Sequence, residues 1–389
     1  MAKSRPVKNS GGRKTTRGSN QGNPRFAHPY FSSTPPEQRA RMLDHIKGTL
    51  RPIPPIKGTG LLSLADIIGN DGASAIKASG KIVFHVAGDT GVPETDHETR
   101  QVYIADAMAK DFDPSHAETS PAFFLHVGDV IYGSSPASFL EQFYRPYMHY
   151  PGKIIAIPGN HDGESDSKMG DFQKYFCSSS PVVPPIAGSI FRETMTQPGV
   201  YWCLDAPFVQ IVGLYSNAAE NPGFISGPKI GSQQKQWLVK TLKWISDARK
   251  GGSRKALLIA THHPPYSGGG HSGSTEMLQD IDDACNQAGL YPDAFFSGHA
   301  HSLQRHTRAV QLGGKKLSIP YIVTGCGGHG GQTVQKADKD KSKNPVFDFS
   351  RQGWGYTKVE IDTQSLVINS YGVDVEQVMQ VDTATVPLT

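Results

Sequence analysis

Residues 123–132 have the sequence FFLHVGDVIY, a short apolar run that ends in Gly-Asp. The run is too short for a helix and is apolar at consecutive positions, which is typical of a strand buried on both faces. Similar runs recur at residues 82–87, 154–157, 209–214, 256–260, 294–296 and 321–323. Together they predict a layered α/β fold.

Helices are expected between several of these runs. Ser232 can cap a helix in which Trp237, Leu238, Leu242 and Ile245 form one apolar stripe before Gly251 ends it. Residues 98–112 and 39–50 are further helix candidates. Near the C-terminus, residues 355–361 and 365–373 are expected to form an antiparallel hairpin that closes the edge of the sheet.

The chain is predicted to contain one domain with irregular ends. Residues 1–26 hold seven Lys or Arg and no acid, although the whole chain has a net charge of only +4. This composition predicts a basic, disordered arm suited to contact with polyanions. Residues 27–80 are expected to be an irregular lead-in with a short helix, residues 81–375 the catalytic domain, and residues 376–389 a C-terminal tail.

Several classes of protein are excluded or disfavoured by composition. The four cysteines are isolated and form no Cys-x-x-Cys pair, which argues against a zinc ribbon or a dithiol site. No apolar signal segment follows the basic start, and no apolar stretch is long enough to span a membrane. No Walker-type phosphate loop occurs. The cytoplasm is therefore the expected location, with an organellar transit segment as the alternative.

Polar residues follow five of the predicted strands. The junctions are Gly88-Asp89, Gly128-Asp129, Asn160-His161-Asp162, His262-His263 and His299-Ala300-His301. Ligands of layered α/β proteins bind beyond the carboxyl ends of the strands, so these side chains are expected at one rim. Carboxylate and imidazole together suit first-row transition metals. His85 and His126 lie within strands and are expected to be hydrogen-bonded core histidines.

These five junctions, in this order, resemble the calcineurin-like metallophosphoesterase superfamily over residues 81–375. Most of that superfamily has Asp-x-His in the first block, where this chain has Gly91 in place of the histidine. Tyr132 instead follows Asp129 by three positions, which is similar to the purple acid phosphatase branch. The resemblance implies a β-sandwich flanked by helices, in an α/β/β/α arrangement.

The resemblance also implies a set of site residues. It places Asp89, Tyr132 and His301 on a first metal ion, Asn160, His262 and His299 on a second, and Asp129 between the two. The family's His-x-Pro spacing selects His262 rather than His263. His161, Asp162 and His271 are the implied catalytic residues: His161 and His271 would face the phosphate, and Asp162 would stand behind His161.

Charge favours Fe(III) as the first ion. A tyrosine hydroxyl has an ordinary pKa near 10, so its ligation at neutral pH requires a strong Lewis acid. The second ion is expected to be divalent Fe, Zn or Mn. The resemblance implies hydrolysis of phosphate monoesters by a metal-bound hydroxide, with phosphodiester hydrolysis at the same metals as the alternative. A non-catalytic phosphate or polyanion binder is the third hypothesis.

Overall fold

The computed structural model describes residues 36–92, 100–113, 115–116, 119–135, 137–163, 169–252, 254–375 and 377–388. The predicted basic arm, residues 1–26, lies outside the described residues. Within the described part of the chain, no helix is both long and apolar enough to cross a membrane.

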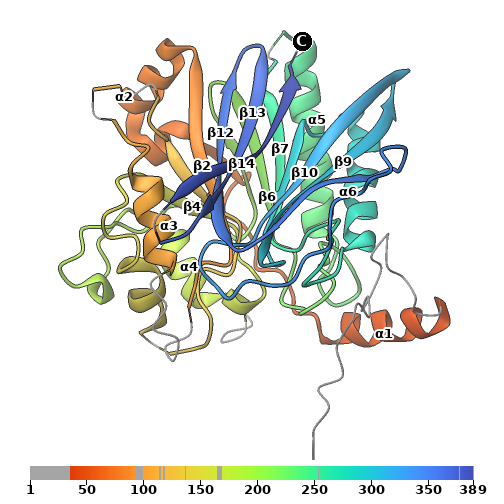
Figure 1. Ribbon diagram of the computed structural model, residues 1–389, viewed down its shortest axis with the longest axis horizontal. Helices are drawn as coiled ribbons and strands as arrows, with labels where there is room; N and C mark the ends of the chain where they lie inside the picture. Colours follow the sequence, from red (N-terminus) through yellow and green to blue (C-terminus); the bar gives the residue numbers. More distant parts are fainter. Residues whose placement is uncertain are drawn as a thin grey trace, which may run out of the picture.

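Two β-sheets form the centre of the molecule (Figure 1). The larger sheet has the strand order β1-β5-β6-β7-β8-β10-β9-β11. In that order the strands span Leu61–Ser63, Trp202–Asp205, Val209–Leu214, Ala256–Thr261, Ala294–Ser297, Lys315–Thr324, Ser302–Leu312 and Val346–Gln352. The smaller sheet has the order β14-β13-β12-β2-β3-β4, spanning Val378–Pro387, Ser365–Val373, Trp354–Asp362, Lys81–Ala87, Phe123–His126 and Lys153–Ala156.

Helices cover the outer faces of the two sheets. Helices α5 (Gln233–Lys250) and α6 (Thr275–Ala288) pack on the larger sheet, where Leu238 and Ile281 are buried. Helices α2 (Leu64–Ser79) and α3 (Arg100–Ala109) contact strands of the smaller sheet. Between the sheets the interior is apolar, with Phe84, Ile211 and Phe296 fully buried. This sandwich flanked by helices confirms the predicted fold class.

The remaining helices lie in the connections. They are α1 (Pro36–Thr49), α4 (Gly170–Phe176), the π-helical turn η1 (Leu140–Tyr144) and the 3-10 turns η2 (His161–Gly163) and η3 (Pro185–Ala187). Each predicted apolar run falls on a strand of the structure, and the helix candidates at 39–50 and 98–112 and after Ser232 correspond to α1, α3 and α5.

Two expectations about the ends of the chain are wrong. The predicted tail forms β14, which pairs with β13, so the 355–373 hairpin does not close the sheet edge. Ala384 and Val386 of β14 pack against the core and alternate with Thr383 and Thr385. An alternating pattern this short does not indicate a strand from the sequence alone. The lead-in also contains β1 and α2. A capping box between Ser63 and Asp66 starts α2, and Gly69, at φ 80°, interrupts its helical pattern.

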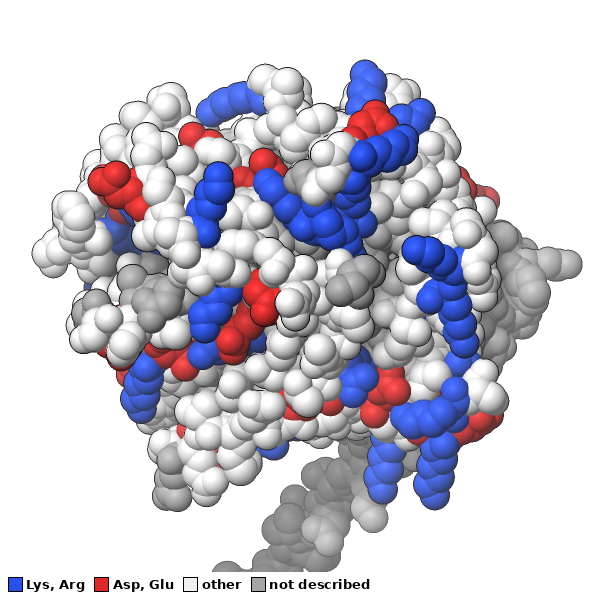
Figure 2. All heavy atoms as spheres, turned by 90° about the horizontal axis from the view of Figure 1, so that it is seen from above, with Lys and Arg blue, Asp and Glu red and all other residues white. Residues whose placement is uncertain are grey.

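Charges are mixed on the face of the molecule seen from above in Figure 1. Lys and Arg side chains lie there in separate groups with Asp and Glu among them (Figure 2). Pairs such as Lys255 with Asp205, at 2.8 Å, lie near the start of β7. Among the described residues, this face therefore presents no unbroken basic surface.

Candidate binuclear metal site

Polar residues that follow five strands, β2, β3, β4, β7 and β8, meet at one rim of the sandwich. The strands β2, β3 and β4 are neighbours in the smaller sheet, and β7 and β8 are neighbours in the larger. Asp89, Asp129 and His299, which follow β2, β3 and β8, all have a positive φ, between 54° and 66°. Such backbone is costly for residues other than glycine and is often kept at functional sites.

Glycines beside these residues allow the strand ends to approach closely. A Cβ atom added to Gly159 would lie 2.0 Å from Asp129 Oδ1, and one added to Gly298 would lie 2.4 Å from Asp89 Oδ2. Both distances are too short for real atoms, so a side chain at either position would displace the carboxylate. This explains why glycine precedes Asn160 and His299. The backbone carrying one candidate ligand packs directly against the carboxylate of another.

Three of the candidate ligands form a compact triangle. Tyr132 Oη lies 3.4 Å from Asp89 Oδ1 and 3.4 Å from His301 Nε2, and the latter two atoms are 3.3 Å apart. Ligand atoms about 2.0–2.2 Å from one ion lie about 3.0–3.4 Å from each other when the angles are near octahedral or tetrahedral. The other ring nitrogen of His301 faces Gly330 O at 2.9 Å, which directs Nε2 into the triangle.

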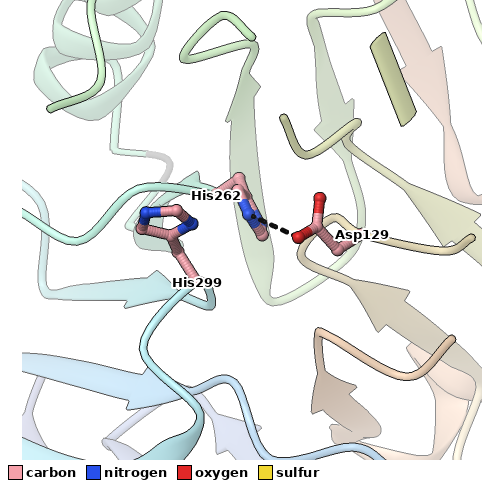
Figure 3. Close-up of side chains that lie close together, drawn as sticks. All are labelled: Asp129, His262 and His299. Carbon is pink, nitrogen blue, oxygen red and sulfur yellow. Dashed lines mark ion pairs between the residues drawn. The ribbon is translucent and has the colours of Figure 1, made fainter. Parts of the chain in front are cut away.

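The second group contains Asp129, Asn160, His262 and His299. Ligand atoms of Asp129, His262 and His299 lie within 4.8 Å of one another (Figure 3). His262 Nε2 is 3.1 Å from Asn160 Oδ1 and 3.3 Å from Asp129 Oδ2. It also lies 4.0 Å from Asp89 Oδ1, so the two groups adjoin.

The donor set fits metal ions. Asp129 Oδ2 is buried and accepts no hydrogen bond of good geometry within the described residues, although it faces His262 Nε2 at 3.3 Å. The ring of His262 is turned into the site because its Nδ1 faces Val127 O at 2.9 Å. A buried carboxylate oxygen without a hydrogen bond is costly in a folded protein, and a bound cation would compensate it.

Electrostatics at the site follow from buried acids close to basic and phenolic groups. Burial, with the charges of Asp129 and Asp89, raises the pKa of Tyr132 well above its ordinary value. Burial opposes protonation of His262, but Asp129 and Asp89 outweigh it and raise its pKa to about 9. Without a cation Tyr132 is therefore neutral. Only a strongly charged cation beside the hydroxyl could stabilise its phenolate form enough for it to act as a ligand.

Of the two adjacent histidines, His262 is the one that faces the site. His263 is buried with both ring nitrogens engaged elsewhere, Nδ1 2.8 Å from Ser216 Oγ and Nε2 2.7 Å from Ala219 O. The two strand histidines are hydrogen-bonded core residues, as predicted. His85 lies against Tyr150 and Asp111, and His126 lies 2.8 Å from Thr90 Oγ1.

The turn η2 brings His161 and Asp162 to the site in different ways. The ring of His161 lies beside that of Tyr132, with centroids 4.4 Å apart, and its backbone N–H donates to Asp129 Oδ1 at 3.0 Å. Asp162 instead accepts backbone N–H bonds from Gly159, Val130 and Ile131. Burial and the charge of Asp129 raise the pKa of Asp162 to about 7. Asp162 therefore joins the loops after β3 and β4.

His271 lies at the second group of ligands. Its ring stacks on that of His299, with centroids 3.9 Å apart. Nδ1 is 2.9 Å from Asn221 Nδ2, and Nε2 is 2.9 Å from Gln332 Nε2. The side chain is only 16% exposed, although it lies in a Gly-rich loop.

Two residues at the site had no assigned role in the sequence. His329 stacks on Tyr132 with ring centroids 3.8 Å apart, and its Nδ1 faces Gly91 O. It lies in the Gly-rich segment 325–331. Glu220 contacts Asn160, His271 and His299, and nothing in its local sequence signals this.

The family model for calcineurin-like phosphoesterases matches residues 82–303. This match covers more than half of the chain and includes each of the candidate metal ligands. The chain therefore belongs to the calcineurin-like phosphoesterase family. No curated protein matches its sequence.

Solved structures agree with this fold at low sequence identity. GAP50, the anchor in the inner membrane complex of Plasmodium, is similar with a TM-score of 0.53 and 12% identity, covering 79% of this chain and 89% of its own. PhoD is similar with a TM-score of 0.49 and 13% identity, covering 79% and 70%. At such identity the likeness to GAP50 supports the fold alone.

Proposed function

We propose that the protein is a phosphomonoester hydrolase of the purple acid phosphatase type, dependent on two metal ions. The observation that carries the proposal is the triangle of Asp89, Tyr132 and His301, whose three ligand atoms lie 3.3–3.4 Å apart. A phenol placed between a carboxylate and an imidazole, inside a family of metal-dependent phosphoesterases, favours ligation by Tyr132.

The proposed first ion is Fe(III), held by Asp89, Tyr132 and His301. The environment of Tyr132 supports a trivalent ion because burial and neighbouring carboxylates oppose ionisation of the phenol. The second ion, divalent Fe, Zn or Mn, would be held by Asn160, His262 and His299. Asp129 would contact both ions, consistent with its buried Oδ2, which makes no hydrogen bond within the described residues. When bound, the two ions supply Lewis-acid charge for a water-derived nucleophile and for the phosphoryl oxygens.

The protein's own residues would bind and orient the ester. His161 lies beside the first group of ligands and His271 beside the second, so their rings can hydrogen-bond the phosphoryl oxygens from two directions. Asp162 would act by fixing the turn that carries His161, through its three backbone hydrogen bonds. A histidine near the leaving group can also supply a proton to it.

Hydrolysis of phosphodiesters uses the same ligands and is the second candidate. The walls of the pocket, including the Gly-rich segment 325–331, would decide between the two ester classes. A binding protein without activity is less favoured because every proposed ligand position holds a residue capable of ligation. A polyanion partner for residues 1–26 and a cytoplasmic location remain proposals from composition.

The proposal is tested by metal analysis together with spectroscopy and phosphate release. The purified protein is expected to contain two ions, one of them iron, and to release phosphate faster from an aryl phosphate than from a bis-aryl phosphate. A phenolate-to-Fe(III) absorption band should be lost in Tyr132→Phe, while Tyr103→Phe on α3 should keep it. An active enzyme that is colourless and free of iron would refute the purple acid phosphatase type but not the family.

A further inference from the structure

Glu220 contacts two members of the second ligand group that come from different sheets: Asn160, which follows β4, and His299, which follows β8. It lies in the loop that follows β6. Its backbone oxygen is 2.7 Å from His299 Nε2, and its Oε2 is 3.5 Å from Asn160 Nδ2. Its Oε1 lies 3.6 Å from His271 Nδ1, beyond hydrogen-bond distance. The side chain is 56% exposed, so the carboxylate lies at the open side of the site.

The backbone contact sets which nitrogen of His299 is available. Because Nε2 faces a carbonyl oxygen, which only accepts hydrogen bonds, the proton must lie on Nε2. Nδ1 is then the nitrogen with a free lone pair for a metal ion. Hydrogen bonds of this kind commonly orient metal-binding histidines.

The side-chain contact sets the orientation of the Asn160 amide. An asparagine binds a metal ion through Oδ1, and the two ends of its amide are nearly equal in shape. A carboxylate can accept from Nδ2 but repels Oδ1. Glu220 Oε2 therefore favours the rotamer in which Oδ1 points toward His262 Nε2, 3.1 Å away.

The loop that carries Glu220 is itself held in place. Ala219, next to Glu220, packs with Phe224 and Ile230 of the same loop against Leu43 of α1. This helix stands at the lower right of Figure 1. The position of the carboxylate is thus fixed by packing outside the two sheets.

We infer that Glu220 is a positioning residue for the second metal ion, acting through Asn160 by its carboxylate and through His299 by its backbone oxygen. The inference rests on the proposed function, because it takes these residues as metal ligands. The negative charge of the Glu220 carboxylate, close to Asn160, also favours retention of a divalent cation. Asp89, Tyr132 and His301, the proposed ligands of the first ion, are not among the described residues that Glu220 contacts, so retention of that ion should not depend on Glu220.

Substitution separates the two contacts. Every variant at position 220 keeps the backbone oxygen and hence the contact with His299. Glu220→Ala removes the acceptor for Asn160 and the charge, whereas Glu220→Gln keeps an oxygen that can accept from Nδ2. Glu193→Ala is the matched control, because Glu193 pairs at 2.7 Å with Lys153 at the start of β4, whereas Asn160 follows the other end of that strand.

The test measures Zn²⁺ affinity in competition with a chromophoric chelator, using protein that carries iron in the first position. Glu220→Ala is expected to bind Zn²⁺ 10- to 100-fold more weakly than wild type, the usual effect of removing a residue that orients a ligand. Glu220→Gln should recover part of this loss, and all variants should keep the iron absorption band.

Two outcomes overturn the inference in distinguishable ways. If wild type binds two ions and releases phosphate, and Glu220→Ala binds Zn²⁺ as tightly as Glu193→Ala, the positioning role is wrong and the proposed function stands. If wild type binds fewer than two ions, the proposed function fails and the inference fails with it.

Discussion

The guanidinium of Arg51 donates a hydrogen bond of 2.9 Å from Nη1 to the backbone oxygen of Gly163, 112 positions further along the chain. Gly163 ends the turn that carries His161. The amide of Asn217 holds the backbone of Arg51 on both sides, donating to its oxygen at 2.9 Å and accepting from its nitrogen at 3.3 Å. A segment that precedes the family match therefore ties together the loops that carry His161 and Glu220.

This link predicts that Arg51→Met lowers both stability and turnover. The substitution leaves the Gly163 oxygen without its charged donor, which should reduce the free energy of unfolding by about 1–2 kcal/mol. Urea denaturation at neutral pH measures the change. Turnover should fall because the turn of His161 is less well held, while metal content stays at the wild-type value.

Arg145→Met is the control for the Arg51 prediction. Arg145 is 57% exposed and pairs with Glu141 four positions earlier on the surface. Exposed pairs of this kind contribute about 0–1 kcal/mol, so little change is expected. Equal effects of the two substitutions would show that the link to Gly163 has no special importance.

Asp129 should matter more to metal content than any other single ligand. It is the proposed contact of both ions, and its buried Oδ2 has no hydrogen bond among the described residues. Asp129→Ala removes negative charge between two cations and is expected to lose both. Asn160→Ala should lose chiefly the second ion.

Elemental analysis of the two variants, purified side by side, decides the bridging role. Circular dichroism confirms that each variant is folded. Retention of two ions by Asp129→Ala would mean that Asp129 does not bridge them.

Because His126 is fully buried, we predict that the protein loses stability in acid. Burial lowers its pKa to about 3, which the charge of Asp129 offsets only in part. The unfolded chain binds a proton at an ordinary pKa near 6.5, so below that pH the unfolded state gains protons that the folded state does not. Stability is therefore complete above pH 6.5 and falls as the pH drops toward 3.

The size of this effect can be measured in protein stripped of metal ions. Between pH 7 and pH 5 the single histidine should cost about 2 kcal/mol of unfolding free energy. In His126→Asn this part of the pH dependence should be missing, while the exposed His149→Asn should follow the wild-type curve. Parallel curves for wild type and His126→Asn would contradict a neutral, buried His126.

The apolar strands could be predicted from the sequence, but the charged ones could not. Strands such as β6 and β7 are buried on both faces and therefore consist of consecutive apolar residues. Strand β9 contains Arg305 and Arg308, which suggest a surface loop. In the structure Arg305 pairs with Asp382 of β14 at 2.7 Å, a partner that no local pattern reveals.

The polar junctions could be found in the sequence because each follows a strand, whereas the assignment of their residues, Tyr132 above all, as metal ligands came from the resemblance to the metallophosphoesterases. Glu220 and His329 could not be found in this way. Glu220 reaches Asn160 and His299 from a loop whose position depends on α1, and His329 acts by stacking on Tyr132. Such contacts depend on three-dimensional packing and leave no fixed interval in the sequence.

His271 combines features of both kinds, and its role can be tested through the leaving group. The resemblance to the purple acid phosphatases implied that it faces the phosphate, whereas its local Gly-rich sequence, residues 267–273, gives no such sign. In the structure, burial and the neighbouring His301 lower its pKa to about 3. The free enzyme therefore presents a neutral imidazole, which can donate a hydrogen bond but has no extra proton to transfer.

A bound phosphate dianion changes this balance, because negative charge next to the ring favours imidazolium and raises the pKa of His271. A proton acquired in this way is needed by an alkoxide leaving group and hardly at all by an activated phenolate. His271→Ala should therefore keep full metal content and lose about 10²- to 10⁴-fold in kcat/KM on alkyl phosphates, with a much smaller loss on activated aryl phosphates. His271→Gln, which can hydrogen-bond but not transfer a proton, should restore the aryl rate and not the alkyl rate. Equal losses on the two substrates would leave His271 only a binding role, and wild-type rates on both would remove it from the site chemistry.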